Sequence, residues 1–281
     1  MSRSKTFFLT SLAMIAFAGN SLLCRLALKQ TGIDAASFTA MRILSGALTL
    51  WLIVRIRHRT PRTSGSWPSA LALFVYAASF SFAYVSLPAA TGSLLLFSAV
   101  QVTMVGYGLW SGERLRTRQA AGLICAFGGL AGLLLPGLAA PPWIGSVLML
   151  SAGIAWGIYS LRGRGLDDPT AATAGNFLRA APMSAVLSLV SLPQHSWNSS
   201  GVAYAIASGA LASAVGYVIW YSALGGLKAT SAATVQLSVP VLAAAGGICF
   251  LGEPITWRLL IASLAILGGI ALVVVSQPRR P

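Results

Sequence analysis

An internal repeat constrains this sequence more than any other feature. Gly112-Glu113 and Gly252-Glu253 lie 140 residues apart, and the same offset, without a gap, aligns Gly128-Gly129 with Gly268-Gly269, Ser98 with Ser238 and Leu87 with Leu227. In both copies an apolar run ends at Gly-Glu, and a second apolar run with a Gly-Gly pair follows. Weak internal symmetry of this kind is typical of duplicated membrane transporters. The pattern predicts two repeats, residues 1–140 and 141–281, that form one unit.

The composition places both repeats in a membrane. Hydrophobic residues make up 56% of the chain and charged residues 9%, whereas a soluble domain carries roughly a quarter of its residues as charged ones. Apolar stretches long enough to cross a bilayer as helices occupy residues 7–26, 36–54, 68–87, 89–110, 119–135, 143–161, 170–192, 202–224, 229–251 and 257–275. The predicted fold class is therefore an all-α integral membrane protein with ten transmembrane helices.

Several functional classes are disfavoured. The net charge of +14 does not indicate a nucleic-acid partner, because the basic residues lie between apolar spans and not in a basic stripe with aromatics. Cys24, Cys125 and Cys249 each lie alone in an apolar run, so we expect no disulfide framework and no metal site. No paired acids, His-Glu-x-x-His helix or Ser/His dyad occurs at membrane depth, so we expect no enzyme activity and no cofactor. The expected partners are the lipid bilayer and a small-molecule substrate, and an oligomer is not required.

The basic residues also predict the orientation. With a cytoplasmic N-terminus, 14 lysines and arginines fall on the inside and three, Arg25, Lys29 and Arg258, on the outside. Both termini are then cytoplasmic, as in a multi-pass protein of a bacterial inner membrane. Residues 16–18 imitate a signal-peptide cleavage site, but the apolar run continues past them, so we expect the first span to be retained. Because each repeat has five spans, the second repeat enters the membrane inverted.

The same residues resemble a known family. The resemblance is carried by the Ala-Gly-Asn at 18–20, residues 38–42, the Gly-Glu-Arg at 112–114, the Gly-Glu-Pro at 252–254 and the Gly-Gly spans after them. In these features the chain is similar to the ten-helix EamA-type exporters of the drug/metabolite transporter superfamily, most of all to the amino-acid exporter branch. The resemblance implies export of amino acids or related metabolites through a central cavity between the halves. Pro240 follows the mid-span Ser in the second repeat, as in the family, whereas the first repeat has Val100-Gln101 there. Pro240 is expected to free a backbone carbonyl toward the cavity.

Aromatic residues at membrane depth are the first candidates for the cavity wall. A four-residue spacing places Tyr76, Phe80 and Tyr84 on one helix face, and the duplication pairs this stripe with Tyr217 and Tyr221. Trp156 lies in the middle of its span, away from the interfaces where tryptophans gather, and Tyr159 follows one turn later. Packing within the bundle is the alternative for each of these rings.

Polar residues at depth are the second set of candidates. Asn20, Ser98, Gln101, Ser238 and also Asn176 have the side chains to hydrogen-bond a substrate. Serine also joins helices to one another, which is the alternative reading. Arg42 and Arg179 fall at similar places in the two halves and are candidates for binding a carboxylate, with backbone carbonyls as the alternative partners. Glu113 and Glu253 are expected to act on the dipoles of the helices that follow them.

The predicted function is export of amino acids, aromatic or other neutral ones, or of similar small metabolites, by alternating access. No carboxylate or histidine lies at the middle of any predicted span, and a proton-coupled transporter normally titrates such a group. The sequence therefore favours uniport. A lipid-carrier flippase or a multidrug exporter of the same fold is the alternative, although an exporter of organic cations is disfavoured by the lack of an intramembrane acid.

Overall fold

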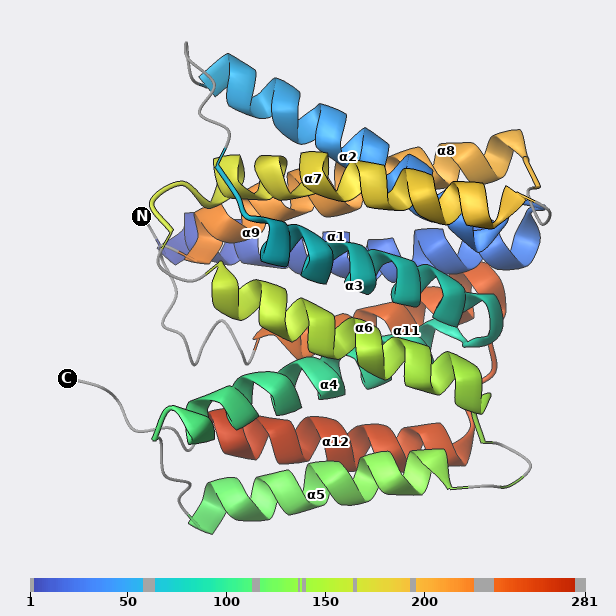
Figure 1. The fold of residues 1–281 in the computed structure, drawn as a ribbon. Coiled ribbons are helices and arrows are strands. Elements are labelled where there is room, and N and C mark those ends of the chain that lie inside the picture. The colour runs from blue at the N-terminus through green and yellow to red at the C-terminus, as the bar shows by residue number, and fades with distance from the viewer. Residues whose placement is uncertain are drawn as a thin grey trace.

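The computed structural model describes residues 3–57, 64–112, 117–135, 137, 140–163, 166–192, 196–224 and 235–275. All regular structure in these residues is helical (Figure 1). The helices are α1 (Arg3–Gln30), α2 (Ala35–Arg57), α3 (Trp67–Ser86), α4 (Ala89–Trp110), α5 (Thr117–Leu134), α6 (Trp143–Arg162), α7 (Pro169–Val190), α8 (Ser199–Ala207), the π-helix η2 (Ser208–Val215), α9 (Gly216–Leu224), α11 (Ser238–Leu251) and α12 (Trp257–Val275). Because α8, η2 and α9 follow one another without a break, the described segments form ten helices, as predicted.

Short polar motifs set several helix starts. Ser66 precedes α3 and its hydroxyl accepts the backbone N–H of Ser69, while the Asp168 carboxylate does the same for Ala171 at the start of α7. Both helices have a proline in their first turn, where the missing N–H costs no helical hydrogen bond. At the other end of α11, Gly252 adopts a left-handed conformation with φ of 62°, which ends the helix.

The membrane-spanning character is clear in most helices. Seven of the described helical segments have at least 18 residues and are apolar enough to cross a membrane, while Ser238–Leu251 of α11 and Trp257–Leu272 of α12 are shorter apolar stretches. The helix expected over residues 229–251 differs from the prediction: it turns at Leu237 and α11 begins at Ser238, and residues 229–234 lie outside the described part. Pro240 thus lies in the first turn of α11, so it breaks no bond within this helix.

The helix contacts show the duplication in three dimensions. Helix α1 packs against α9 and α11, and α6 packs correspondingly against α3 and α4. Three further contacts join equivalent helices of the two halves: α2 with α7, α4 with α11, and α5 with α12. Exchanging the halves therefore maps each of these contacts onto another of them. Equivalent helices run in opposite directions, and α1 begins at the same end of the bundle at which α12 ends (Figure 1). This is the inverted arrangement expected from two five-helix repeats.

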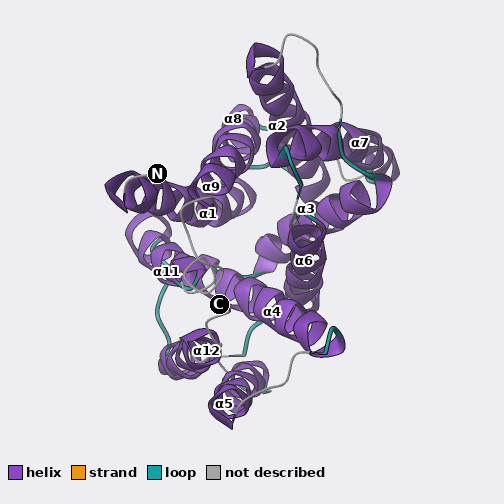
Figure 2. Ribbon diagram, turned by 90° about the vertical axis from the view of Figure 1, so that its left-hand side faces the viewer, coloured by secondary structure: helices purple, strands orange, loops and turns teal. Residues whose placement is uncertain are grey.

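The second glycine of each Gly-Gly pair has a packing role. Viewed along the helices, α4 and α11 lie between the α5–α12 pair and the remaining helices (Figure 2). A Cβ atom at Gly129 of α5 would lie 2.8 Å from the Cβ of Ala265, and one at Gly269 of α12 would lie 2.4 Å from the carbonyl oxygen of Gly122. Only glycine permits so close an approach of two helices, which is how membrane helices pack without a hydrophobic driving force.

Candidate functional site

A small cavity lined by aromatic rings lies between the two repeats. Helices α1, α3 and α4 of the first repeat and α6 and α9 of the second contribute to it. The lining residues, which we call the aromatic cavity, are Phe17, Asn20, Ser21, Tyr76, Phe80, Leu96, Phe97, Trp156 and Tyr217. Five residues predicted for the substrate site therefore come together here: Asn20, Tyr76, Phe80, Trp156 and Tyr217.

Trp156 is at the centre of the ring contacts. Its ring centroid lies 4.9 Å from that of Tyr76, 5.0 Å from Tyr217 and 6.5 Å from Phe17, so α1, α3, α6 and α9 all meet at one indole. Tyr159, one turn further along α6, stacks on the same indole at 5.5 Å. Ring pairs at these separations attract one another beyond simple contact. Trp156 thus connects both repeats through the contacts of its ring.

The aromatic cavity is closed in this conformation. Its volume is about 20 Å³, which is room for one water molecule and far too little for an amino acid. Any metabolite that uses this cavity requires the helices around it to move apart.

Asn20 connects the aromatic cavity to the π-helix. Its side-chain amide donates to the Tyr76 hydroxyl at 3.2 Å, and its oxygen accepts from the Ser208 hydroxyl of η2 at 2.6 Å. π-Helical turns are rare and often occur at functional sites. Gly209, the next residue of η2, allows α2 to approach closely, because a Cβ there would lie 2.1 Å from the Arg42 carbonyl oxygen.

Arg42 lies behind the cavity wall and is almost entirely buried, with 1% of its surface exposed. Its Nη2 donates to the Tyr76 hydroxyl at 3.0 Å and its Nε to Ser213 of η2 at 3.3 Å. The guanidinium carbon lies 5.0 Å from the centroid of the Tyr76 ring and 4.9 Å from that of Phe80. Both hydrogen-bond partners are neutral. The Nη1 atom of Arg42 and the hydroxyl of Tyr217 are buried and have no hydrogen-bond partner.

Three other predicted site residues, Tyr84, Tyr159 and Tyr221, do not line the aromatic cavity. Tyr84 packs edge-on against Phe80, with ring centroids 4.7 Å apart. Tyr159 donates its hydroxyl hydrogen to Thr173 at 3.3 Å. Tyr221 lies beside Gly163 at the end of α6.

Two further candidates lie away from the cavity. The Ser238 hydroxyl donates to the carbonyl of Val235 at the start of α11. The half-buried Arg179 donates to the backbone carbonyls of Ser64 and Gly175 at 3.1 and 2.9 Å. In this structure its partners are therefore backbone carbonyls, the alternative to a substrate carboxylate.

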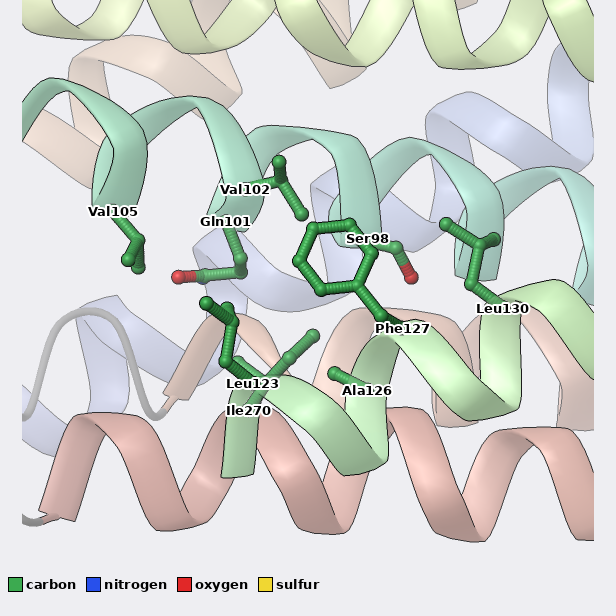
Figure 3. A pocket seen from close by; sticks show the side chains of 9 residues that line it. All are labelled: Ser98, Gln101, Val102, Val105, Leu123, Ala126, Phe127, Leu130 and Ile270. Carbon is green, nitrogen blue, oxygen red and sulfur yellow. The ribbon is translucent and has the colours of Figure 1, made fainter. Parts of the chain in front are cut away.

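Ser98 and Gln101 do not line the aromatic cavity. They line a separate, mainly apolar pocket between α4, α5 and α12, together with residues such as Leu123, Phe127 and Ile270 (Figure 3). The Ser98 hydroxyl donates to the carbonyl of Leu94 in its own helix at 2.6 Å. The structure therefore places these two polar residues in a different pocket from the one that the tyrosines line, and their contact with substrate stays a prediction.

Hydrogen bonds between the repeats close one end of the bundle, which we call the Glu253 end. The Glu253 carboxylate forms an ion pair with Arg25 of α1, with Nε and Oε1 3.0 Å apart. Its other oxygen accepts the backbone N–H of Ala89, the first residue of α4, at 2.7 Å. Arg25 also donates to the carbonyls of Tyr84 and Val85 at 2.8 and 3.0 Å. A carboxylate of the second repeat thus holds three segments of the first.

The prediction for Glu253 is consequently wrong about the helix involved. We expected its charge to act on the helix that follows it, yet the carboxylate lies at the N-terminus of α4 and beside Arg25. The helix-dipole argument itself holds, because an acid at a helix N-terminus is favourable. Glu113, the equivalent residue in the first repeat, lies outside the described residues.

The opposite end, which we call the Asn176 end, is also bridged. The Asn176 side chain accepts the backbone N–H of Ser66 at 2.9 Å, and Arg162 donates to the Ser69 hydroxyl at 3.0 Å. Arg179 reaches the carbonyl of Ser64 in the same region. Asn176, a predicted substrate contact, therefore joins α7 to the start of α3. Bonds between the repeats lie on both sides of the aromatic cavity, in agreement with its closed state.

Sequence reasoning missed five polar or aromatic residues of this region: Phe17, Ser21, Phe97, Ser208 and Ser213. Phe17 lies one turn before Asn20, and Ser21 lies one turn after Phe17, so helical spacing was a usable signal for both. Ser208 and Ser213, which contact Asn20 and Arg42, both lie in the π-helix η2, and no simple sequence pattern marks a π-helix.

Comparisons with known proteins agree with this architecture. The sequence profile of the EamA-like transporter family matches residues 4–135 and again residues 143–275. An uncharacterized protein of Pseudomonas aeruginosa is 58% identical over 100% of this chain and 98% of its own length. A solved structure that is 21% identical matches 97% of this chain and 98% of its own, with a TM-score of 0.68, and so shares the fold.

Two more distant relatives carry functional names. The "Threonine/homoserine exporter RhtA" of Salmonella typhimurium is 30% identical over 48% of this chain and 48% of its own. The "Probable terminal-alkyne amino-acid exporter" of Streptantibioticus cattleyicolor is 24% identical over 90% of this chain and 88% of its own. Because the family profile covers both halves of a duplicated helical bundle, this chain is a multi-pass membrane transporter, not an enzyme, and belongs to the EamA-like transporter family.

Proposed function

We propose that this transporter exports amino acids, aromatic or other neutral ones, or similar small metabolites, through the aromatic cavity by alternating access. The observation that carries the proposal is a closed cavity lined by both inverted repeats, with bonds between the repeats at each end. Opening one end while the other stays closed exposes such a cavity to one side of the membrane at a time.

The chemistry of the lining supports a small, partly apolar substrate. Ring faces of Trp156, Tyr76 and Phe80 offer an apolar surface, while Asn20 and the tyrosine hydroxyls offer hydrogen bonds. The residues that line the cavity include no carboxylate, which disfavours an organic cation as the preferred cargo. Two relatives named as exporters of amino acids, one similar over 90% of this chain, support the same substrate class.

The same lining favours uniport. Among the described residues, those that line the aromatic cavity include no carboxylate and no histidine, so none of them is a group that titrates near neutral pH and could couple substrate to protons. Direction then follows the substrate gradient, and each tenfold gradient supplies roughly 1.4 kcal/mol.

The proposed orientation has both termini in the cytoplasm. The bias of basic residues supports it, and the Glu253 end then faces the outside. Reporter fusions after Pro281 and within residues 137–142 measure the orientation. A C-terminal reporter that is active on the outer side contradicts it.

A transport screen tests the substrate class. Purified protein in liposomes is offered labelled amino acids, threonine and phenylalanine among them, and in parallel quaternary ammonium dyes. We expect saturable amino-acid flux that empty liposomes lack. Dye flux without amino-acid flux would assign the protein to the multidrug exporters instead.

A further inference from the structure

Arg42 has an unusual electrostatic environment. Three charged residues are buried in the described part of the chain: Arg25 and Glu253 pair with each other, whereas Arg42 has only the neutral hydroxyls of Tyr76 and Ser213. A buried cation without a counter-ion is strongly unfavourable unless another group supplies negative charge. The ring faces of Tyr76 and Phe80 beside the guanidinium offset only part of this cost. The uncompensated charge points to an anionic ligand.

Unused hydrogen-bond donors gather around the same wall of the aromatic cavity. The Nη1 atom of Arg42 and the hydroxyl of Tyr217 are both buried without a partner. Tyr76 accepts hydrogen bonds from Arg42 and Asn20, which leaves its own O–H to donate. A carboxylate is negatively charged, and its two oxygens only accept hydrogen bonds. It therefore matches a positive charge that is surrounded by hydrogen-bond donors without acceptors.

We propose that Arg42, Tyr217 and Tyr76 form a carboxylate subsite, so that the transporter selects its substrates by a carboxylate attached to a compact apolar body. This inference rests on the proposed function and narrows it. In the closed conformation the guanidinium lies behind Tyr76 and Phe80, and widening of the cavity brings the carboxylate to it. The ring of Trp156 then faces the rest of the molecule. An amine or ester of the same shape leaves Arg42 uncompensated and is rejected.

A ligand series tests the subsite on the unaltered protein. Labelled L-phenylalanine and L-threonine are bound to purified protein, and four unlabelled molecules compete: L-phenylalanine, 3-phenylpropionate, L-phenylalanine methyl ester and 2-phenylethylamine. The two carboxylates are expected to compete at least tenfold better than the ester and the amine. Equal competition by all four would overturn the subsite while leaving the proposed amino-acid export intact. If neither labelled amino acid binds and liposomes show no amino-acid flux, the proposed function fails and the subsite fails with it.

Matched arginine variants separate recognition from folding. Arg42→Gln is expected to weaken carboxylate binding roughly ten- to hundredfold without weakening the ester, so that the preference disappears. Arg42→Lys keeps the charge and is expected to retain the preference with lower affinity. Arg179→Gln removes the other intramembrane arginine, whose guanidinium binds carbonyls, and is expected to keep the preference of the parent. If Arg42→Gln elutes as a single species and still prefers carboxylates tenfold, Arg42 is structural and the subsite is refuted.

Discussion

Removing the charge of Glu253 should open the Glu253 end of the bundle. The two oxygens of the Glu253 carboxylate accept from Arg25 Nε and from the Ala89 N–H. In the Glu253→Gln variant an NH₂ group replaces one of these oxygens, so this new donor must face either the Arg25 or the Ala89 donor. At 3.0 Å and an effective dielectric constant of about 20, the lost attraction is at most about 5.5 kcal/mol. Arg25 retains two carbonyl partners, at 2.8 and 3.0 Å, so we expect a net loss of about 2–3 kcal/mol.

A native cysteine next to Arg25 reports this opening. Cys24 is buried, with 0% of its surface exposed, whereas Cys125 and Cys249 are exposed. In a background with Cys125→Ser and Cys249→Ser, a membrane-impermeant thiol reagent added from the Glu253 end measures how often Cys24 becomes accessible. A shift of about 2–3 kcal/mol in favour of the open state predicts labelling roughly 30- to 150-fold faster in Glu253→Gln.

The control for this experiment is Lys29→Gln, which removes an exposed charge near the same end. It should label at the parental rate. If Glu253→Gln labels Cys24 no faster than the control and unfolds at the same temperature as the parent, the ion pair does not hold this end closed, and the reasoning about its energy is refuted.

Three further predictions follow from the packing and the cavity. Gly209→Ala forces η2 away from the Arg42 carbonyl, since its Cβ would lie 2.1 Å from that oxygen, and we expect thermal unfolding to show a loss of stability of about 1–3 kcal/mol. The control is Gly106→Ala, where nothing lies within 4 Å of the added Cβ, so this variant should show none of the strain. Equal stability of the two variants would contradict the close approach. Trp156→Ala removes ring contacts to four neighbours and should lower stability by about 2–4 kcal/mol. It should also lower substrate affinity, measured by competition, at least tenfold. Unchanged affinity would show that Trp156 does not contact the substrate. With equal substrate on both sides of a liposome, a pH gradient alone should drive no accumulation, and concentrative uptake under that gradient would show proton coupling.

The sequence predicts the helices and the duplication well because both depend on local or periodic signals. Apolar length defines each span, and the glycines of the repeat recur at a fixed offset since Gly129 and Gly269 perform the same packing task in α5 and α12. The four-residue spacing of Tyr76 and Phe80 likewise identifies one face of α3, and both residues line the aromatic cavity.

The sequence does not reveal which face of a helix turns toward which neighbour. On α4, Phe97 and Ser98 are adjacent, yet one lines the aromatic cavity and the other the pocket at α5 and α12, because successive residues of a helix are about 100° apart around its axis. The Arg25–Glu253 pair joins residues 228 positions apart in the chain, and no local pattern connects them. The contacts of η2 depend in addition on a π-helical register that hydrophobic spacing does not mark.

Blocking the aromatic cavity from within tests most directly whether it is the transport path. Ser21 lines the cavity and is 1% exposed, so a cysteine-free protein carrying Ser21→Cys offers one thiol there. In liposomes with labelled amino acid on one side and excess unlabelled amino acid on the other, we expect exchange that stops when this thiol is modified, and slower modification when substrate is present. Full exchange by protein whose Ser21→Cys thiol is completely modified would show that substrate does not pass through this cavity.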